Sequence, residues 1–115
     1  MIIFRSSAGA FGLLLAGCST GNPLPDEATL LGQVARINNF AEREVALQRF
    51  AEARLDRPQA LRAELLRAGF KERKFREQGV ECQGFDWNDE GMFPVVMLVN
   101  ICGRTVSANA GQIAP

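Results

Sequence analysis

Hydrophobic residues between positions 26 and 54 recur at intervals of three and four, the spacing of an amphipathic helix. The residues on this predicted face are Leu30, Val34, Ile37 and Ala41. Asn38 and Asn39 interrupt the segment, and Asn39 with Glu42 has the spacing of a capping box, which starts a helix. The pattern therefore predicts either one kinked helix or two short ones. The large side chains of its second half are Phe40, Leu47 and Phe50.

A second helical pattern begins at Pro58, a residue suited to the first position of a helix. Leu61 and Leu65 are four residues apart and therefore stack on one face. Gly69 is a typical helix end. We expect Phe70, directly after this glycine, to pack back onto the domain.

The spacing changes to that of strands after Phe70. The segments 80–87 (VECQGFDW) and 95–102 (VVMLVNIC) are rich in β-branched and aromatic residues, and the turn-forming residues 88–94 lie between them. Residues 104–111 suit a last short strand, and the charged segment 70–78 suits an edge strand or an extended loop. The order predicts an α+β fold, in which two to three N-terminal helices pack on a small antiparallel sheet of three to four strands.

Composition limits the function more than it changes this fold. A chain of 115 residues is long enough for one domain, and its 13 basic and 13 acidic residues cancel, which disfavours binding to nucleic acid. The chain has no histidine, which excludes Ser–His and Cys–His nucleophiles. It also has no phosphate-binding glycine motif. We therefore expect no cofactor, and no small-molecule substrate is evident.

The N-terminus has the layers of an export signal. Arg5 supplies a positive charge, and an apolar run follows at residues 8–17. This run ends in small residues, as export signals do. The run has ten residues, about half of the ~20 that a helix needs to cross a bilayer. We therefore expect a processed signal rather than a transmembrane anchor.

The sequence Leu15-Ala16-Gly17-Cys18 resembles the lipobox of bacterial lipoproteins. The resemblance implies a signal peptide at residues 1–17, removed before Cys18, and lipid attachment to that cysteine, which anchors the chain to a membrane. Residues 18–25 then form a short tether and residues 26–115 a single domain. For this class, Ser19 rather than aspartate implies an outer-membrane location facing the periplasm, or the outer face of the cytoplasmic membrane where no outer membrane exists.

With Cys18 lipidated, Cys82 and Cys102 are the remaining thiols of an exported protein, where disulfides persist. If these cysteines face each other in a hairpin, the same register pairs Phe85 with Val99 and Trp87 with Met97 on one face. That face collects most of the large apolar groups, as a buried face requires. A disulfide therefore agrees with the hydrophobic pattern; a reactive thiol pair and a metal site are the alternatives, although two thiolates are too few for a zinc site.

Two surface features are candidate partner contacts. The basic cluster Lys71, Arg73, Lys74 and Arg76 suits either anionic head groups or an acidic partner, or it protects an edge strand from aggregation. Met92 and Phe93 lie in a predicted turn, where they either anchor a partner or fold over the sheet.

The acidic residues Glu81, Asp86, Asp89 and Glu90 are the available carboxylates near one another in the sequence. Three of the four lie in or beside the predicted turn, where acidic side chains are usually solvated. We assign no catalytic residue and no metal ligand.

These features predict a small, non-enzymatic envelope lipoprotein that acts as an interaction or assembly-accessory module. The order of helices and strands loosely resembles small lipoproteins that assist outer-membrane barrel assembly, which is a likeness of architecture alone. The alternative is an inhibitor or exclusion factor against a lytic enzyme or a phage. The helical half of the domain disfavours a lysozyme inhibitor of the largely β type.

Overall fold

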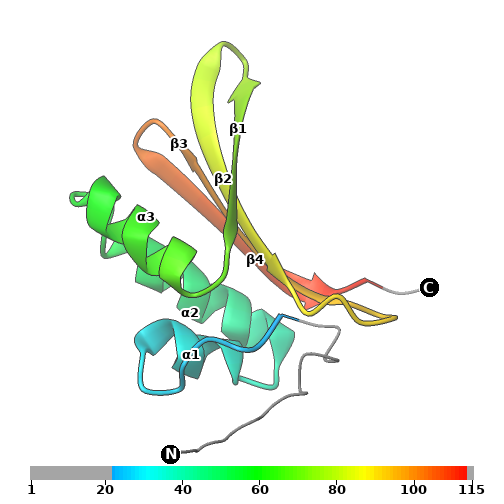
Figure 1. Cartoon of the computed structure of the whole chain (residues 1–115). Helices are drawn as coiled ribbons and strands as arrows, with labels where there is room; N and C mark the ends of the chain where they lie inside the picture. Colours follow the sequence, from blue (N-terminus) through cyan, green and yellow to red (C-terminus); the bar gives the residue numbers. More distant parts are fainter. Residues whose placement is uncertain (1–21, 114–115) are drawn as a thin grey trace, which may run out of the picture.

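A computed structural model describes residues 22–113, and the lipobox and Cys18 lie outside the described residues. Three helices precede four strands along the chain, which confirms the predicted α+β class (Figure 1). The helices are α1 (Leu30–Ala35), α2 (Phe40–Glu52) and α3 (Pro58–Arg67). The strands are β1 (Lys71–Glu77), β2 (Val80–Asn88), β3 (Val95–Cys102) and β4 (Thr105–Gln112).

The first helical segment is two helices, because Asn39 starts a new one. The Asn39 side chain accepts a hydrogen bond from the backbone N–H of Glu42 at 3.0 Å, which satisfies a free donor of the first turn of α2. The first helix starts later than position 26. Thr29 caps α1 by accepting from the Gly32 N–H at 2.9 Å, and Asp26 lies in the turn before it.

The buried face of α1 differs from the predicted one. Leu31, Val34 and Ala35 are buried, whereas Leu30 is exposed. The predicted face was therefore right for Val34 and wrong for Leu30. Ala41 is exposed as well, because it belongs to α2 rather than to a continuation of α1.

The end of α3 follows the prediction. Gly69 has φ of +98°, a conformation that glycine adopts without strain. The Phe70 N–H then donates to the Leu65 carbonyl at 3.0 Å. Phe70 is buried in the core, as expected from its position after the glycine.

The sheet is a simple antiparallel meander in the order β1-β2-β3-β4, so β1 and β4 are its edges. Cys82 pairs with Cys102, Phe85 with Val99 and Trp87 with Met97, which confirms the predicted register. The segment 70–78 contains the edge strand β1 rather than a loop.

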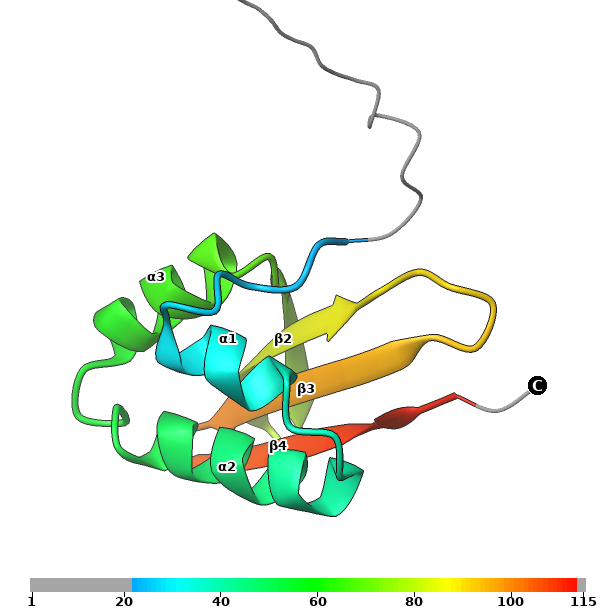
Figure 2. The same cartoon turned by 90° about the horizontal axis from the view of Figure 1, so that it is seen from below.

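The helices cover one face of this sheet, which we call the covered face, and leave the other, the open face, without a helical layer (Figure 2). Phe85, Trp87, Met97 and Val99 point into the covered face and are buried by the helices. The other buried members of this core are Leu31, Val34, Ala35, Leu47, Phe50, Ala51, Leu61, Leu65, Phe70 and Ala108.

The antiparallel meander also gives the sheet two different ends. The turns between β1 and β2 and between β3 and β4 lie at one end, which we call the turn end. The loop 89–94 between β2 and β3, together with the C-terminal end of β4, lies at the opposite end, the loop end. Val80 and Asn88 at the two ends of β2 are eight residues apart, or about 26 Å.

Helix α2 covers the outer edge of β4. Gln48 accepts from the Ala108 N–H at 2.7 Å and donates to the Val106 carbonyl at 2.9 Å. Glu44 accepts from the Ala110 N–H at 3.1 Å. These bonds occupy backbone groups that an edge strand otherwise offers to another chain.

Across residues 22–113, none of the helices combines the length and the apolar character that crossing a bilayer requires.

Candidate functional site

The centre of the open face is a row of four residues, one from each strand. The strand register places Arg73 beside Gly84, Gly84 beside Asn100 and Asn100 beside Ser107. Because directly paired residues of an antiparallel sheet point to the same side, these side chains share the open face. We call this set the central row.

Gly84 leaves room for the other side chains of the central row. A Cβ atom at this position would lie 2.9 Å from Arg73 Cζ and 2.9 Å from Asn100 Oδ1, closer than carbon normally approaches either atom. The guanidinium of Arg73 also lies over the Phe75 ring, 4.9 Å from its centroid, in a cation–π contact. Glycine thus lets a charged group lie flat across the sheet beside an amide.

The amide oxygen of Asn100 is buried and accepts no hydrogen bond from any residue between 22 and 113. Two other buried atoms share this property, Glu72 Oε2 and Trp87 Nε1, but both belong to residues on the covered face. An unpaired buried acceptor costs free energy unless a donor reaches it. The central row therefore places a guanidinium cation next to a buried amide oxygen that accepts no hydrogen bond from residues 22–113.

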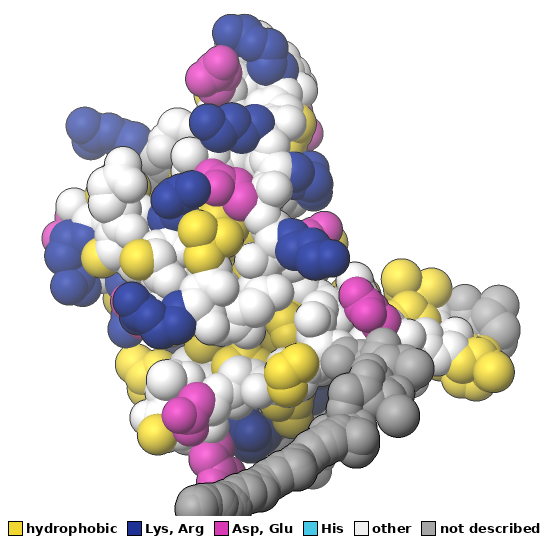
Figure 3. All heavy atoms as spheres, viewed as in Figure 1, with side chains coloured by type: hydrophobic (Ala, Val, Ile, Leu, Met, Phe, Trp, Pro, Cys, Tyr) yellow, Lys and Arg dark blue, Asp and Glu magenta, His cyan; other side chains and the backbone are white. Residues whose placement is uncertain are grey.

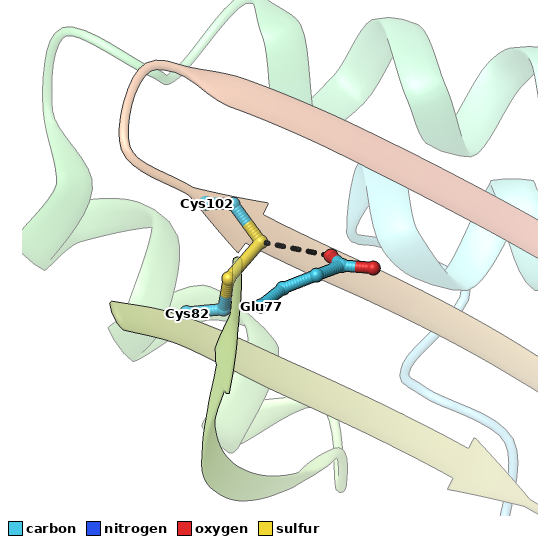
Figure 4. A group of neighbouring side chains, drawn as sticks. All are labelled: Glu77, Cys82 and Cys102. Carbon is cyan, nitrogen blue, oxygen red and sulfur yellow. Dashed lines mark hydrogen bonds between the residues drawn. A yellow bond between two sulfur atoms is a disulfide. The ribbon is translucent and has the colours of Figure 1, made fainter. Parts of the chain in front are cut away.

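Cys82 and Cys102 form a disulfide next to this row, toward the turn end (Figure 4). The carboxylate of Glu77 lies 3.9 Å from Cys102 Sγ and completes a group of three neighbouring side chains with oxygen or sulfur atoms. Sulfurs joined in a disulfide are not thiolate ligands, since metals bind the reduced, deprotonated form. In this structure the pair links β2 to β3 covalently.

The predicted basic cluster is divided between the two faces of the sheet. Lys71 and Arg73 share the open face with Asp86 and Gly84, whereas Lys74 and Arg76 alternate to the other side. Basic side chains are accordingly scattered in the surface view and do not form one patch (Figure 3). Only Arg73 of the four belongs to the central row.

Glu72 lies within this basic segment and pairs with helix α3. Its Oε1 accepts from Arg62 Nε at 3.0 Å and lies 2.9 Å from Arg62 Nη2. The hydrogen bond, and then the attraction between the charges, raise the pKa of the Arg62 guanidinium. This pair connects α3 to the edge strand.

Met92 and Phe93 are far from the central row, in the loop at the loop end. Met92 is 87% exposed and Phe93 is 43% exposed, so neither side chain folds over the sheet. These residues therefore form a separate surface.

The four acidic residues do not form one site. Glu81 lies near the turn end and Asp89 beyond the opposite end of β2. Asp89 Oδ1 accepts from the backbone N–H groups of Gly91 and Val95, each at 3.1 Å, so this carboxylate shapes its own loop. Asp86 belongs to the open face, next to Lys71 across the strands.

Sequence reasoning missed Arg43, which is the buried charged residue among those described. Its Nε and Nη2 donate to the Ile37 carbonyl at 2.9 and 2.6 Å, which satisfies a carbonyl in the connection between α1 and α2, and its guanidinium lies 5.0 Å from the Phe40 ring centroid. Burial lowers the pKa of Arg43. The signal was its spacing of four and seven residues from Leu47 and Phe50, on the apolar face of α2.

The predicted hairpin register correctly pairs Gly84 with Asn100. Sequence reasoning did not bring Arg73 and Ser107 beside them, because these residues come from the two edge strands. No protein-family model, curated protein sequence or solved structure matches the chain.

Proposed function

We propose that this chain is a small envelope lipoprotein, anchored by lipid on Cys18, whose domain binds another envelope protein through the open face of its sheet. The observation that carries the proposal is the central row, in which Arg73 and Asn100 lie on either side of Gly84. The lipobox supports the membrane location, and Ser19 supports the outer membrane in a bacterium that has one.

The chemistry of the open face indicates the kind of partner. Arg73 offers a planar cation that pairs well with a carboxylate. The half-buried Phe75 and Leu98 add apolar contact on either side of the row. A protein segment that carries an acidic residue next to an apolar one matches both features.

Photo-cross-linking in living cells tests this proposal. A photoreactive amino acid at Ser107, an exposed position in the central row, is compared with the same amino acid at Ala63, which is exposed on α3. We expect a protein adduct from position 107 and a much weaker one from position 63. Equal labelling at both positions, or none at 107, would contradict the open face as the binding surface.

The identity of the cross-linked protein then separates the two functions. An integral outer-membrane protein supports an assembly accessory, whereas a lytic enzyme supports the inhibitor. The anchor is tested separately by the mass of the N-terminal peptide and by Cys18→Ser, which should move the protein from the membrane to the soluble fraction.

A further inference from the structure

The loop end of the domain carries a group of exposed apolar side chains. Met92 is 87% exposed, Ile113 is 54% exposed and Phe93 is 43% exposed. Hydrogen bonds hold the two segments together: the Ile113 N–H donates to the Pro94 carbonyl at 2.9 Å, and Gln112 Nε2 donates to the Phe93 carbonyl at 3.0 Å. These residues form one apolar tip, visible at the right of the surface view (Figure 3).

The loop holds the tip in a defined shape. Asn88 Oδ1 accepts from the Glu90 N–H at 2.8 Å, and Asp89 accepts from two further N–H groups of the same loop. Side chains of the loop thus accept hydrogen bonds from several of its own backbone N–H groups. The apolar side chains remain outside this network and in solvent.

The N-terminal segment reaches the domain at the same end. Asn22 Nδ2 donates to the Asn88 carbonyl at 3.0 Å, and Arg36 Nη1 donates to the Pro25 carbonyl at 2.7 Å. Pro25 is buried, so residues 22–25 pack on the domain although the sequence assigned them to the tether. Cys18 precedes Asn22 by only four residues, which span at most about 14 Å.

We propose that the loop end rests on the bilayer that holds the anchor, with Met92, Phe93 and Ile113 in contact with its lipids. This inference rests on the proposed lipidation of Cys18. The anchor brings the membrane to within about 14 Å of Asn22, and the apolar tip lies at the end of the sheet where Asn22 binds. The turn end, about 26 Å away along β2, points away from the bilayer.

The charges around the tip indicate how it contacts lipid. The charged residues of the loop itself are Asp89 and Glu90. Arg36, at the end of α1, lines a hollow together with Asp89, and Lys71 of β1 pairs with Asp86 close by, so charges of both signs surround the tip. Contact therefore depends on apolar burial rather than on attraction to anionic head groups.

This orientation places the members of the basic cluster at different distances from the bilayer. Arg76 pairs with Glu81, seven residues or about 23 Å along β2 from Asn88, which is too far from the loop end to reach the head groups beneath the tip. Lys71 pairs with Asp86, only two residues from Asn88, and lies near the loop end. The open face stands beside the membrane, where a neighbouring envelope protein can approach it.

Tryptophan quenching in vesicles tests the proposal. The lipidated full-length protein is reconstituted in phosphatidylcholine vesicles with brominated acyl chains, and Phe93→Trp is compared with Val80→Trp. Val80 is 46% exposed, nearly the same as Phe93, but lies at the turn end. The wild-type protein supplies the background, because the buried Trp87 is its single tryptophan.

We expect brominated lipid to quench a larger fraction of the tryptophan emission in the Phe93→Trp protein than in the wild type. In the Val80→Trp protein the quenched fraction should not exceed that of the wild type. Met92→Trp gives an independent measurement if the Phe93→Trp protein does not fold. Replacing part of the phosphatidylcholine with phosphatidylglycerol should leave the quenching at position 93 largely unchanged, because the contact depends on apolar burial.

Equal quenching at positions 80 and 93, or no quenching at 92 and 93 in protein shown by mass to carry acyl chains, would overturn the docked orientation while leaving the proposed function intact. A protein rather than a lipid adduct from a photoreactive group at position 92 would do the same. An N-terminal peptide without acyl chains would overturn both proposals.

Discussion

The two faces of the sheet are stabilised in different ways. On the covered face, Phe85 and Val99 are completely buried under the helices. On the open face, the neighbouring Cys82 and Cys102 are joined covalently, and polar residues follow in the next row. A small domain can therefore leave one sheet face without a helical layer because a disulfide replaces part of the stabilisation that a second layer would supply.

The largest difference between the faces should appear on removal of a core aromatic. We expect Phe85→Ala to lower the free energy of unfolding by about 3–5 kcal/mol, because it deletes a fully buried ring. Leu98→Ala removes a half-buried side chain from the open face and should cost about 1 kcal/mol. Urea unfolding measures both, and equal losses would remove the distinction between the faces.

Loss of the disulfide should have the next largest effect. The bond closes a loop with a sequence separation of 20, which stabilises the fold by about 3 kcal/mol in the chain-entropy model. The double variant Cys82→Ser, Cys102→Ser should show this loss in urea unfolding. A reductant should destabilise the wild type by a similar amount and leave the variant unchanged; a wild type indifferent to reductant would contradict the role of the bond.

A smaller effect is expected where α2 covers the edge of β4. Gln48→Ala removes bonds to Ala108 and Val106, which should cost about 1–2 kcal/mol. The exposed edge should also increase self-association, measured by sedimentation. Gln59→Ala, at an exposed position of α3, is the control and should change neither property.

The smallest effect on stability, and the largest on binding, is expected at Arg73. Arg73→Ala changes an exposed side chain, so the free energy of unfolding should stay within about 0.5 kcal/mol of the wild type. The adduct from the photoreactive group at position 107 should nevertheless disappear. Lys74→Ala alters the next residue, on the other face, and should leave the adduct intact; if Lys74→Ala removed it as well, recognition would depend on net charge rather than on the central row.

Local patterns in the sequence predicted the pairing of β2 with β3 correctly. Two independent signals agree on it, the positions of Cys82 and Cys102 and the alternation of apolar residues around Phe85 and Trp87. Alternation has a period of two, so a shift by one residue would turn every apolar side chain to the wrong face. The same kind of local signal placed α3 and its end at Gly69.

Local patterns were less successful where the chain begins to fold. Asp26 follows Pro25, a sequence typical of a helix start. In the structure, however, the Thr29 N–H donates to the Asp26 carbonyl and closes a turn, and α1 begins only at Leu30. An acidic residue after a proline suits both structures, so local chemistry does not distinguish them. The predicted buried face was also wrong for Leu30, which is exposed in the first turn of α1.

The sequence by itself therefore determined the fold class, the hairpin register, the cysteine pairing and the expectation of a lipid anchor, because each depends on residue spacing within a short segment. The tertiary structure alone decided that Gln48 protects the β4 edge, that Arg73 meets Asn100 across Gly84, and that Asn22 and Ile113 lie at the end of the sheet that carries Met92 and Phe93. These contacts join residues far apart along the chain. Their positions become related only when the sheet and its helices pack, and no periodicity in the sequence records them.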